Sequence, residues 1–304
     1  MSYQHVIVLG IDGAGQYFRD ADTPCFDAIF ARGSVTYRAF ASNPSISAEC
    51  WGSMLTGVSP RLHGRTNEIV STTPYPLDAP FPSLFRRIHE AMPGAVLGSF
   101  CDWNPITFGI VESNLPVTRD TARDDELLPR ICDYIRQSRP TFLFAHADSV
   151  DGAGHGHGYG SRAFLDRLHV VDGYIGQIWQ AVVDTGMAED TLFVVIADHG
   201  GTYNGEDQPA GHGGWTDGEK LVTFALTGKT VIPGEMGDAN VRDLAAIVLH
   251  ALDIPAPAFD ENGWTSQIPE NLFAEPGLPA YRDISGETGA TPRVSLKQHT
   301  SQDA

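Results

Sequence analysis

Residues 5–11 read HVIVLGI, a short run without a formally charged side chain that ends directly before Asp12. Such a run, rich in β-branched residues, is typical of a strand buried on both faces of a parallel sheet. Residues 141–147 (TFLFAHA) and 191–197 (TLFVVIA) repeat the pattern. These three stretches predict the centre of a largely parallel sheet.

Helical patterns alternate with strand patterns along the rest of the chain. Further strands are expected at residues 35–41, 95–100 and 222–227. Helices are expected near residues 24–32, 47–56, 82–92, 120–138, 161–185 and 241–252. This alternation predicts an α/β fold with helices on both faces of the sheet.

The chain has 304 residues, of which 42% are hydrophobic and 19% charged, so it can bury a large core. We expect a single catalytic domain over residues 1–304. Part of residues 58–140 is expected to form a cap or insert, and residues 256–304 a tail that wraps the surface. No signal peptide or membrane span is recognisable, which favours a cytoplasmic protein.

The charge distribution argues against two classes of partner. There are 38 acidic against 20 basic residues, a formal charge of −18, and only three lysines. No run of basic residues could follow a nucleic-acid polymer or an anionic membrane surface. A phosphate-bearing substrate would be repelled by this bulk charge, so its site would need local cations. The oligomeric state stays open.

Metal-ligand side chains follow three of the expected strands. In parallel α/β sheets such groups gather at the carboxyl ends of the strands. We expect the Asp151-Gly-Ala-Gly-His155 segment and the segment around His212 to be glycine-rich loops that fold closely around an ion. The candidate ligands are Asp12, Asp151, His155, Asp198, His199 and His212.

Three carboxylates and three imidazoles favour Zn²⁺, with Mn²⁺ or iron as alternatives, over a magnesium or calcium site made of oxygens alone. Six ligands are too many for one open catalytic ion. Shared between two divalent ions about 3.5–4 Å apart, they suit phosphoryl transfer.

Ser47 is the candidate nucleophile. It opens a predicted helix that ends at Gly57, and the free N–H groups of a helix N-terminus favour an anion. A serine there is usually only a helix cap. Beside a divalent ion, however, its hydroxyl pKa falls and it can attack phosphorus.

The order of these motifs resembles the alkaline phosphatase superfamily, and most closely its type I phosphodiesterase/nucleotide pyrophosphatase branch. The resemblance spans about residues 6–255. It implies a three-layer α/β/α sandwich around a mostly parallel mixed sheet. It also implies one metal ion held by Asp151, His155 and His212, and a second held by Asp12, Asp198, His199 and Ser47.

The sequence departs from that branch beside the nucleophile. Cys50 stands where an asparagine that contacts phosphate is common, and a thiol is a poor donor. The backbone N–H groups of Ala48 or Glu49 are candidates to replace that contact. His157 is a further candidate substrate contact.

Rival functions fit the sequence less well. A dinucleotide fingerprint fails because Phe18 stands where its third glycine belongs. A sulfatase would need proline and arginine after the nucleophile, and a phosphosugar mutase a large second domain. A phosphomonoesterase and an inactive metal-binding homologue remain open. The sequence favours a two-metal phosphoric ester hydrolase that acts on a small phosphate-ester or nucleotide-like substrate through a phosphoserine at Ser47.

Overall fold

Eight strands form one mixed sheet in the computed structural model, which describes residues 3–274 and 278–282. The strand order is β4-β3-β5-β1-β6-β7-β2-β8. The strands are β1 (His5–Ile11), β2 (Ser34–Phe40), β3 (Leu97–Cys101), β4 (Val117–Asp120), β5 (Phe142–Ala147), β6 (Thr191–Ala197), β7 (Leu221–Thr227) and β8 (Gly234–Glu235).

Strands β1, β5 and β6 form the centre of the sheet. They run parallel to one another, and every residue in them is buried. Their uninterrupted apolar sequences suit this position because both faces of the sheet are covered. Strand β7 runs antiparallel to its neighbours β6 and β2.

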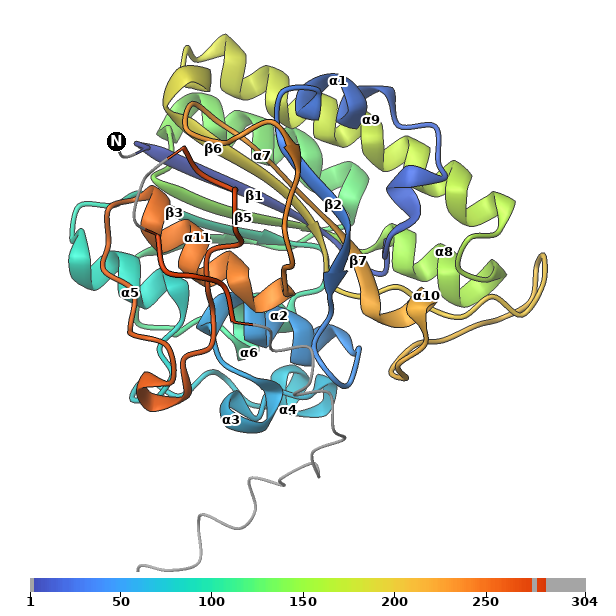
Figure 1. Cartoon of the computed structure of the whole chain (residues 1–304), viewed down its shortest axis with the longest axis horizontal. Helices are drawn as coiled ribbons and strands as arrows, with labels where there is room; N and C mark the ends of the chain where they lie inside the picture. Colours follow the sequence, from blue (N-terminus) through green and yellow to red (C-terminus); the bar gives the residue numbers. More distant parts are fainter. Residues whose placement is uncertain (1–2, 275–277, 283–304) are drawn as a thin grey trace, which may run out of the picture.

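Helices cover both faces of the sheet (Figure 1), with α2, α5, α6 and α11 on one face and α1, α7 and α9 on the other. The helices are α1 (Pro24–Phe30), α2 (Ser47–Thr56), α3 (Pro60–His63), α4 (Asn67–Thr72), α5 (Leu84–Ala91), α6 (Pro105–Gly109), α7 (Asp124–Ser138), α8 (Ser149–His157), α9 (Arg162–Asp184), α10 (Asp217–Lys220) and α11 (Leu244–Ala251). The structure also contains short 3₁₀ turns at η1 (Tyr17–Arg19), η2 (Ala188–Asp190), η3 (Val241–Asp243) and η4 (Glu261–Gly263).

The predicted three-layer fold is confirmed. Residues 58–140 contribute β3 and β4 to the same sheet as well as several helices, and the idea that part of this range forms a cap stays a prediction. Of the predicted tail, residues 275–277 and 283–304 lie outside the described residues.

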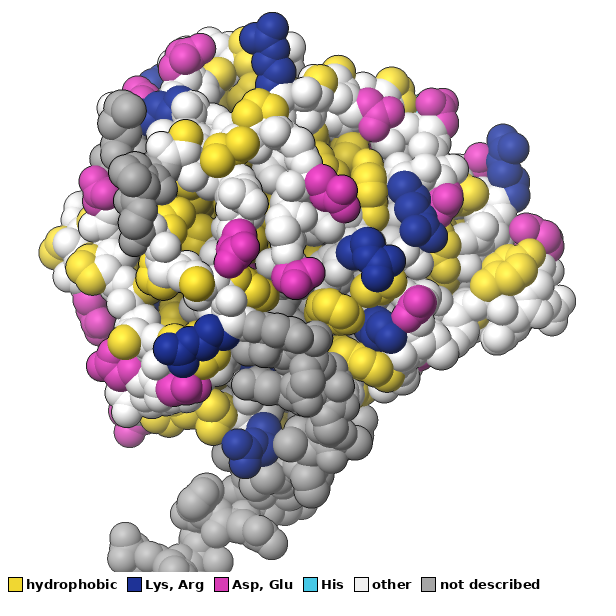
Figure 2. Space-filling model, in the orientation of Figure 1, with side chains coloured by type: hydrophobic (Ala, Val, Ile, Leu, Met, Phe, Trp, Pro, Cys, Tyr) yellow, Lys and Arg dark blue, Asp and Glu magenta, His cyan; other side chains and the backbone are white. Residues whose placement is uncertain are grey.

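Charged side chains of both signs are scattered over the face seen in Figure 2, among exposed apolar atoms. Among the residues that the structure describes, no helix combines the length and apolar character needed to cross a bilayer.

Candidate metal centre and nucleophile

Three aspartates lie side by side at the carboxyl edge of the central strands. Ile11 is in register with Ala147 of β5 and with Ala197 of β6. Each of these three residues is followed directly by an aspartate. The strand alignment therefore brings Asp12, Asp148 and Asp198 to one edge of the sheet.

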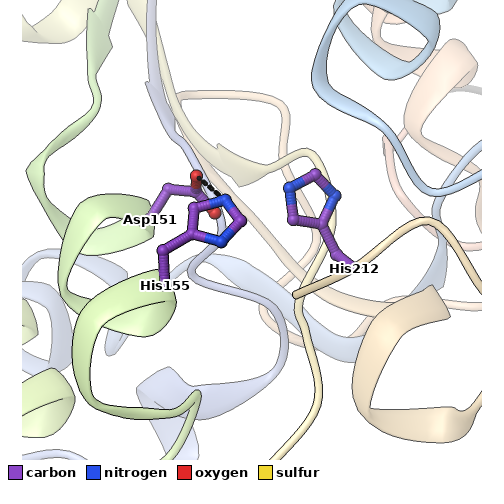
Figure 3. A group of neighbouring side chains, drawn as sticks. All are labelled: Asp151, His155 and His212. Carbon is purple, nitrogen blue, oxygen red and sulfur yellow. Dashed lines mark ion pairs between the residues drawn. The ribbon is translucent and has the colours of Figure 1, made fainter. Parts of the chain in front are cut away.

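The first ligand cluster consists of Asp151, His155 and His212. Figure 3 shows Asp151 and His155 on the same helix and His212 facing them from a loop. His155 Nε2 lies 3.1 Å from Asp151 Oδ2. One potential ligand atom from each of the three residues lies within 4.8 Å of the others.

Our expectation of a loop at Asp151 and His155 is wrong, because both lie in α8. The glycines between them weaken a helix, but Asp124 supports its first turn. The Asp124 carboxylate accepts hydrogen bonds from the backbone N–H of Asp148 at 3.0 Å and of Ser149 at 3.2 Å. In a helix, a spacing of four residues places Asp151 and His155 on the same face.

The second cluster consists of Asp12, Asp198 and His199, all of them buried. His199 Nε2 lies 3.4 Å from Asp12 Oδ1 and 3.3 Å from Asp198 Oδ2. Asp198 Oδ1 accepts hydrogen bonds from the backbone N–H of Gly13 at 3.0 Å and of His199 at 2.8 Å. Gly13 has a positive φ of 66°, and a side chain on it would overlap Asp151.

The histidine tautomers suit metal binding in both clusters. The Nδ1 atom of each imidazole lies within hydrogen-bond distance of a backbone carbonyl oxygen. Since a carbonyl oxygen only accepts, Nδ1 must carry the proton, and in the neutral ring the lone pair is then on Nε2. The pairs are His155–Ala210 at 3.0 Å, His199–Gly200 at 3.0 Å and His212–Ser45 at 2.8 Å.

Asp198 gives a second reason to expect a cation. Its Oδ2 atom is buried and accepts no hydrogen bond from any residue that the structure describes. Burial and the neighbouring Asp12 raise the pKa of Asp198 well above its usual range. A divalent cation would satisfy the Oδ2 lone pairs and compensate the clustered negative charge. The donor set therefore fits the implied metal ions.

Charge pairing is strongest in the first cluster. The hydrogen bond that His155 donates to the Asp151 carboxylate raises the pKa of His155 to about 9. Burial would raise the Asp151 pKa, but His155 and other donors hold it well below its usual value. One of these donors is Tyr159, whose hydroxyl donates to Asp151 Oδ1 at 2.6 Å.

Ser47 begins α2 and lies at the second cluster. Its Oγ atom is 3.5 Å from Asp12 Oδ1 and 3.1 Å from His199 Nε2. The side chain is 7% exposed, so the hydroxyl lies at the wall of the site. The structure thus brings the sequence-predicted nucleophile to the predicted ligands of the second metal ion.

Cys50 and the candidate substrate contacts Ala48 and His157 have different surroundings. Cys50 is completely buried, and burial raises the pKa of its thiol, so it cannot touch substrate in this conformation. The Ala48 N–H already donates to Asn67 Oδ1 at 2.9 Å. His157 is exposed and lies 3.0 Å from the Asp207 carboxylate, and its contact with substrate stays a prediction.

Sequence reasoning missed Asn67 and Tyr159 as parts of this site. Asn67 follows Ser47 by twenty residues and belongs to α4, so only the folded chain brings its amide to the start of α2. Tyr159 lies two residues beyond the end of α8, so only the folded chain brings its hydroxyl to Asp151.

Comparison with known proteins gives the family. The model of the family "Type I phosphodiesterase / nucleotide pyrophosphatase" matches residues 6–74 and 93–243. Ectonucleotide pyrophosphatase/phosphodiesterase 1 of Saccharomyces cerevisiae is 29% identical over 83 residues, which cover 24% of this chain and 11% of that protein. The match thus spans about a tenth of the curated relative.

Solved structures share the fold at low sequence identity. Murine ectonucleotide pyrophosphatase/phosphodiesterase 5 superposes with a TM-score of 0.68 at 15% identity, covering 84% of this chain and 97% of that one. A 2-O GAG sulfatase superposes with a TM-score of 0.69 at 14% identity. The match covers 87% of this chain and 73% of the sulfatase chain. With the family match over most of its length, the chain belongs to the type I phosphodiesterase/nucleotide pyrophosphatase family, a family of metal-dependent hydrolases.

Proposed function

We propose that the protein hydrolyses phosphodiester or pyrophosphate bonds through a covalent phosphoserine at Ser47. The observation that carries the proposal is the position of the Ser47 hydroxyl. It stands at the N-terminus of α2, within 3.5 Å of Asp12 Oδ1 and 3.1 Å of His199 Nε2. A hydroxyl used only as a helix cap does not need two metal-ligand side chains around it.

Two divalent ions fit the two clusters, with Zn²⁺ as our first choice and Mn²⁺ or iron as alternatives. Asp151, His155 and His212 would hold one ion. Asp12, Asp198 and His199, with Ser47, would hold the other. The ions would neutralise the phosphate oxygens and lower the pKa of the Ser47 hydroxyl.

The covalent route consists of two displacements. The Ser47 oxygen, having lost its proton to solvent, forms a bond to phosphorus. The bond to the leaving oxygen breaks with its electron pair, and that oxygen takes up a proton from water. A water molecule then attacks the phosphoserine and loses a proton, and Ser47 recovers its electron pair and a proton. One water is consumed for each ester bond cleaved.

Asn67 is proposed as a neutral phosphate contact in place of Ala48. Because Asn67 Oδ1 accepts the Ala48 N–H at 2.9 Å, the amide lies at the start of α2 beside the nucleophile. The Nδ2 group of the same amide is a donor. It would hydrogen-bond a phosphate oxygen of the substrate without adding charge.

The proposed substrate is a small phosphodiester or nucleotide-like molecule. The formal charge of −18 disfavours a long polyanion, because only the metal centre would attract it. The murine relative is also known as an inactive variant in complex with AMP, a small nucleotide that suits this size class.

Steady-state kinetics on zinc-reconstituted protein would test the proposal, with an aryl phosphodiester, an aryl phosphate monoester and an aryl sulfate compared. We expect the diester to react fastest and Ser47→Ala to lower its kcat/KM by about 10³-fold or more with both metal ions retained. Ser53→Ala is the control, since Ser53 is a buried serine of the same helix whose hydroxyl donates to the backbone oxygen of Glu49.

Three results would contradict the proposal or redirect it. Unchanged turnover in Ser47→Ala would exclude Ser47 as the nucleophile. A faster monoester would favour the monoesterase alternative. Inversion of configuration at phosphorus would exclude the covalent route, because two in-line displacements give net retention.

A further inference from the structure

Asp12 uses its two carboxylate oxygens differently. Oδ1 faces Ser47 and His199. Oδ2 lies 3.1 Å from the indole Nε1 of Trp51 and 3.0 Å from Nε2 of His146. A carboxylate oxygen only accepts, so both nitrogens donate to it, and together they occupy the two lone pairs of Oδ2.

Local packing fixes both donors. Trp51 is one turn after Ser47 on α2, so the two side chains lie on the same face of the helix. Its ring rests on β1 at Gly10, where any side chain would collide with it. The ring also makes edge contacts with His146, at 5.1 Å between centroids, and with Phe144, at 5.6 Å.

We propose that Trp51 and His146 are positioning residues that hold Oδ2 of Asp12 away from the metal ion and direct Oδ1 alone towards it. Asp12 then binds the ion through a single oxygen, and the same helix that carries the nucleophile sets the orientation of its ligand. Partners behind a ligand contribute to metal affinity because they remove its alternative orientations.

The positioning role rests on the proposed function only in that Asp12 binds a metal ion. Two competing roles for the same side chains lead to different outcomes. If Trp51 and His146 only fill the core, their volume matters and their N–H groups do not. If Asp12, His146 and Asp148, which lie close enough to share an ion, hold a third ion, His146 is itself a ligand.

Stepwise Zn²⁺ titration of the metal-free protein against a competing chelator separates these cases. Trp51→Phe and His146→Leu each remove one N–H donor to Asp12 and still fill most of the space with an apolar side chain. His146→Gln retains an N–H group near the Nε2 position. Phe142→Leu is the control, because Phe142 is a buried aromatic residue of the same strand as His146 and its ring packs against Phe85. His155→Ala removes a ligand only from the other cluster, where His155 pairs with Asp151, and so identifies the Asp12 site.

We expect wild-type protein to bind two ions. Trp51→Phe and His146→Leu should weaken the Asp12 site about 10- to 100-fold and leave the other site unchanged. His146→Gln should stay within about 3-fold of wild type, and Phe142→Leu should lower the melting temperature without changing either affinity.

The inference is overturned if both sites weaken equally, if neither weakens, or if His146→Gln is as weak as His146→Leu. Binding of three ions by the wild type would also overturn the positioning role, because Asp12, His146 and Asp148 would then hold a third ion. Wild-type protein that binds no ion would instead refute the proposed function, so the two failures are distinguishable.

Discussion

Asp198 and Asp243 are both completely buried, and burial raises the pKa of both carboxyl groups. Their hydrogen bonding differs. Asp243 Oδ2 accepts from the Asn240 N–H at 2.8 Å and the Tyr281 hydroxyl at 2.8 Å, and Oδ1 accepts from the Gln267 N–H at 2.9 Å. Asp198 has donors on Oδ1 only, within the part of the chain that the structure describes.

The comparison shows that burial alone does not identify a functional carboxylate. Asp243 accepts hydrogen bonds from the turn before α11 and from the segment around Tyr281. Its role is therefore to hold these parts of the fold together. Asp198 keeps an oxygen open towards other acidic and imidazole groups, an arrangement that a divalent cation would satisfy. The open lone pair is therefore the more informative signal.

The largest expected effect comes from Asp198→Asn. Loss of this charged ligand should lower kcat/KM for the diester by about 10³-fold. The free energy of unfolding of the metal-free protein should rise by about 1–3 kcal/mol at pH 7. The new amide can donate to His199, and it replaces a carboxyl group that must either bury its charge or take up a proton on folding. Enzyme assays and urea unfolding without metal measure both. A loss of metal-free stability would contradict the contrast with Asp243.

The next effect is a pH dependence specific to Asp243. Burial raises the pKa of Asp243 to about 7 against the hydrogen bonds from Asn240, Gln267 and Tyr281. The folded state thus binds a proton that the unfolded chain releases near pH 4. Its contribution to stability is complete below that pH and is lost as pH rises to about 7.

Urea unfolding of wild type and Asp243→Asn between pH 4.5 and 7.5 would detect this. The stability difference, wild type minus variant, should fall by about 1.4 kcal/mol for each pH unit up to about pH 7 and then level off. The kcat/KM of Asp243→Asn should match wild type. A difference independent of pH would show that the Asp243 pKa is not raised.

The smallest effect is expected for Tyr281→Phe, which removes one hydrogen bond to Asp243 and keeps the ring. The free energy of unfolding should fall by about 1 kcal/mol at pH 7 with no change in kcat/KM. Equilibrium unfolding with activity assays on the same samples measures this. If activity falls together with stability, the separation between the two carboxylates fails.

The sequence predicted the sheet and its ligand-bearing edge because both depend on local patterns. The runs at β1, β5 and β6 are continuous and apolar. The ligands follow those strands directly or lie in glycine-rich segments that contain few other side chains able to bind a metal ion. Strand β4 was missed because VTRD is short and polar. The α8 helix was missed because its glycines suggest a loop, whereas its support comes from Asp124.

Contacts between distant segments could not be predicted in this way. Trp51, His146 and Asn67 each have an ordinary local role, as an apolar helix residue, a strand residue and the first residue of a short helix. Their hydrogen bonds to Asp12 and Ala48 depend on how α2 and α4 pack at the sheet edge. No spacing along the chain encodes that packing.

The three glycines within α8 make it a weak helix. A side chain at Gly154 would collide with Tyr159. At Gly152 and Gly156, by contrast, a Cβ atom would have open space around it. Each such glycine costs a helix about 1 kcal/mol relative to alanine. An ion bound by both Asp151 and His155 would link successive turns of this weak helix. Without the ion, α8 should therefore unfold locally before the rest of the protein. Metal binding and the ordering of α8 should then occur together.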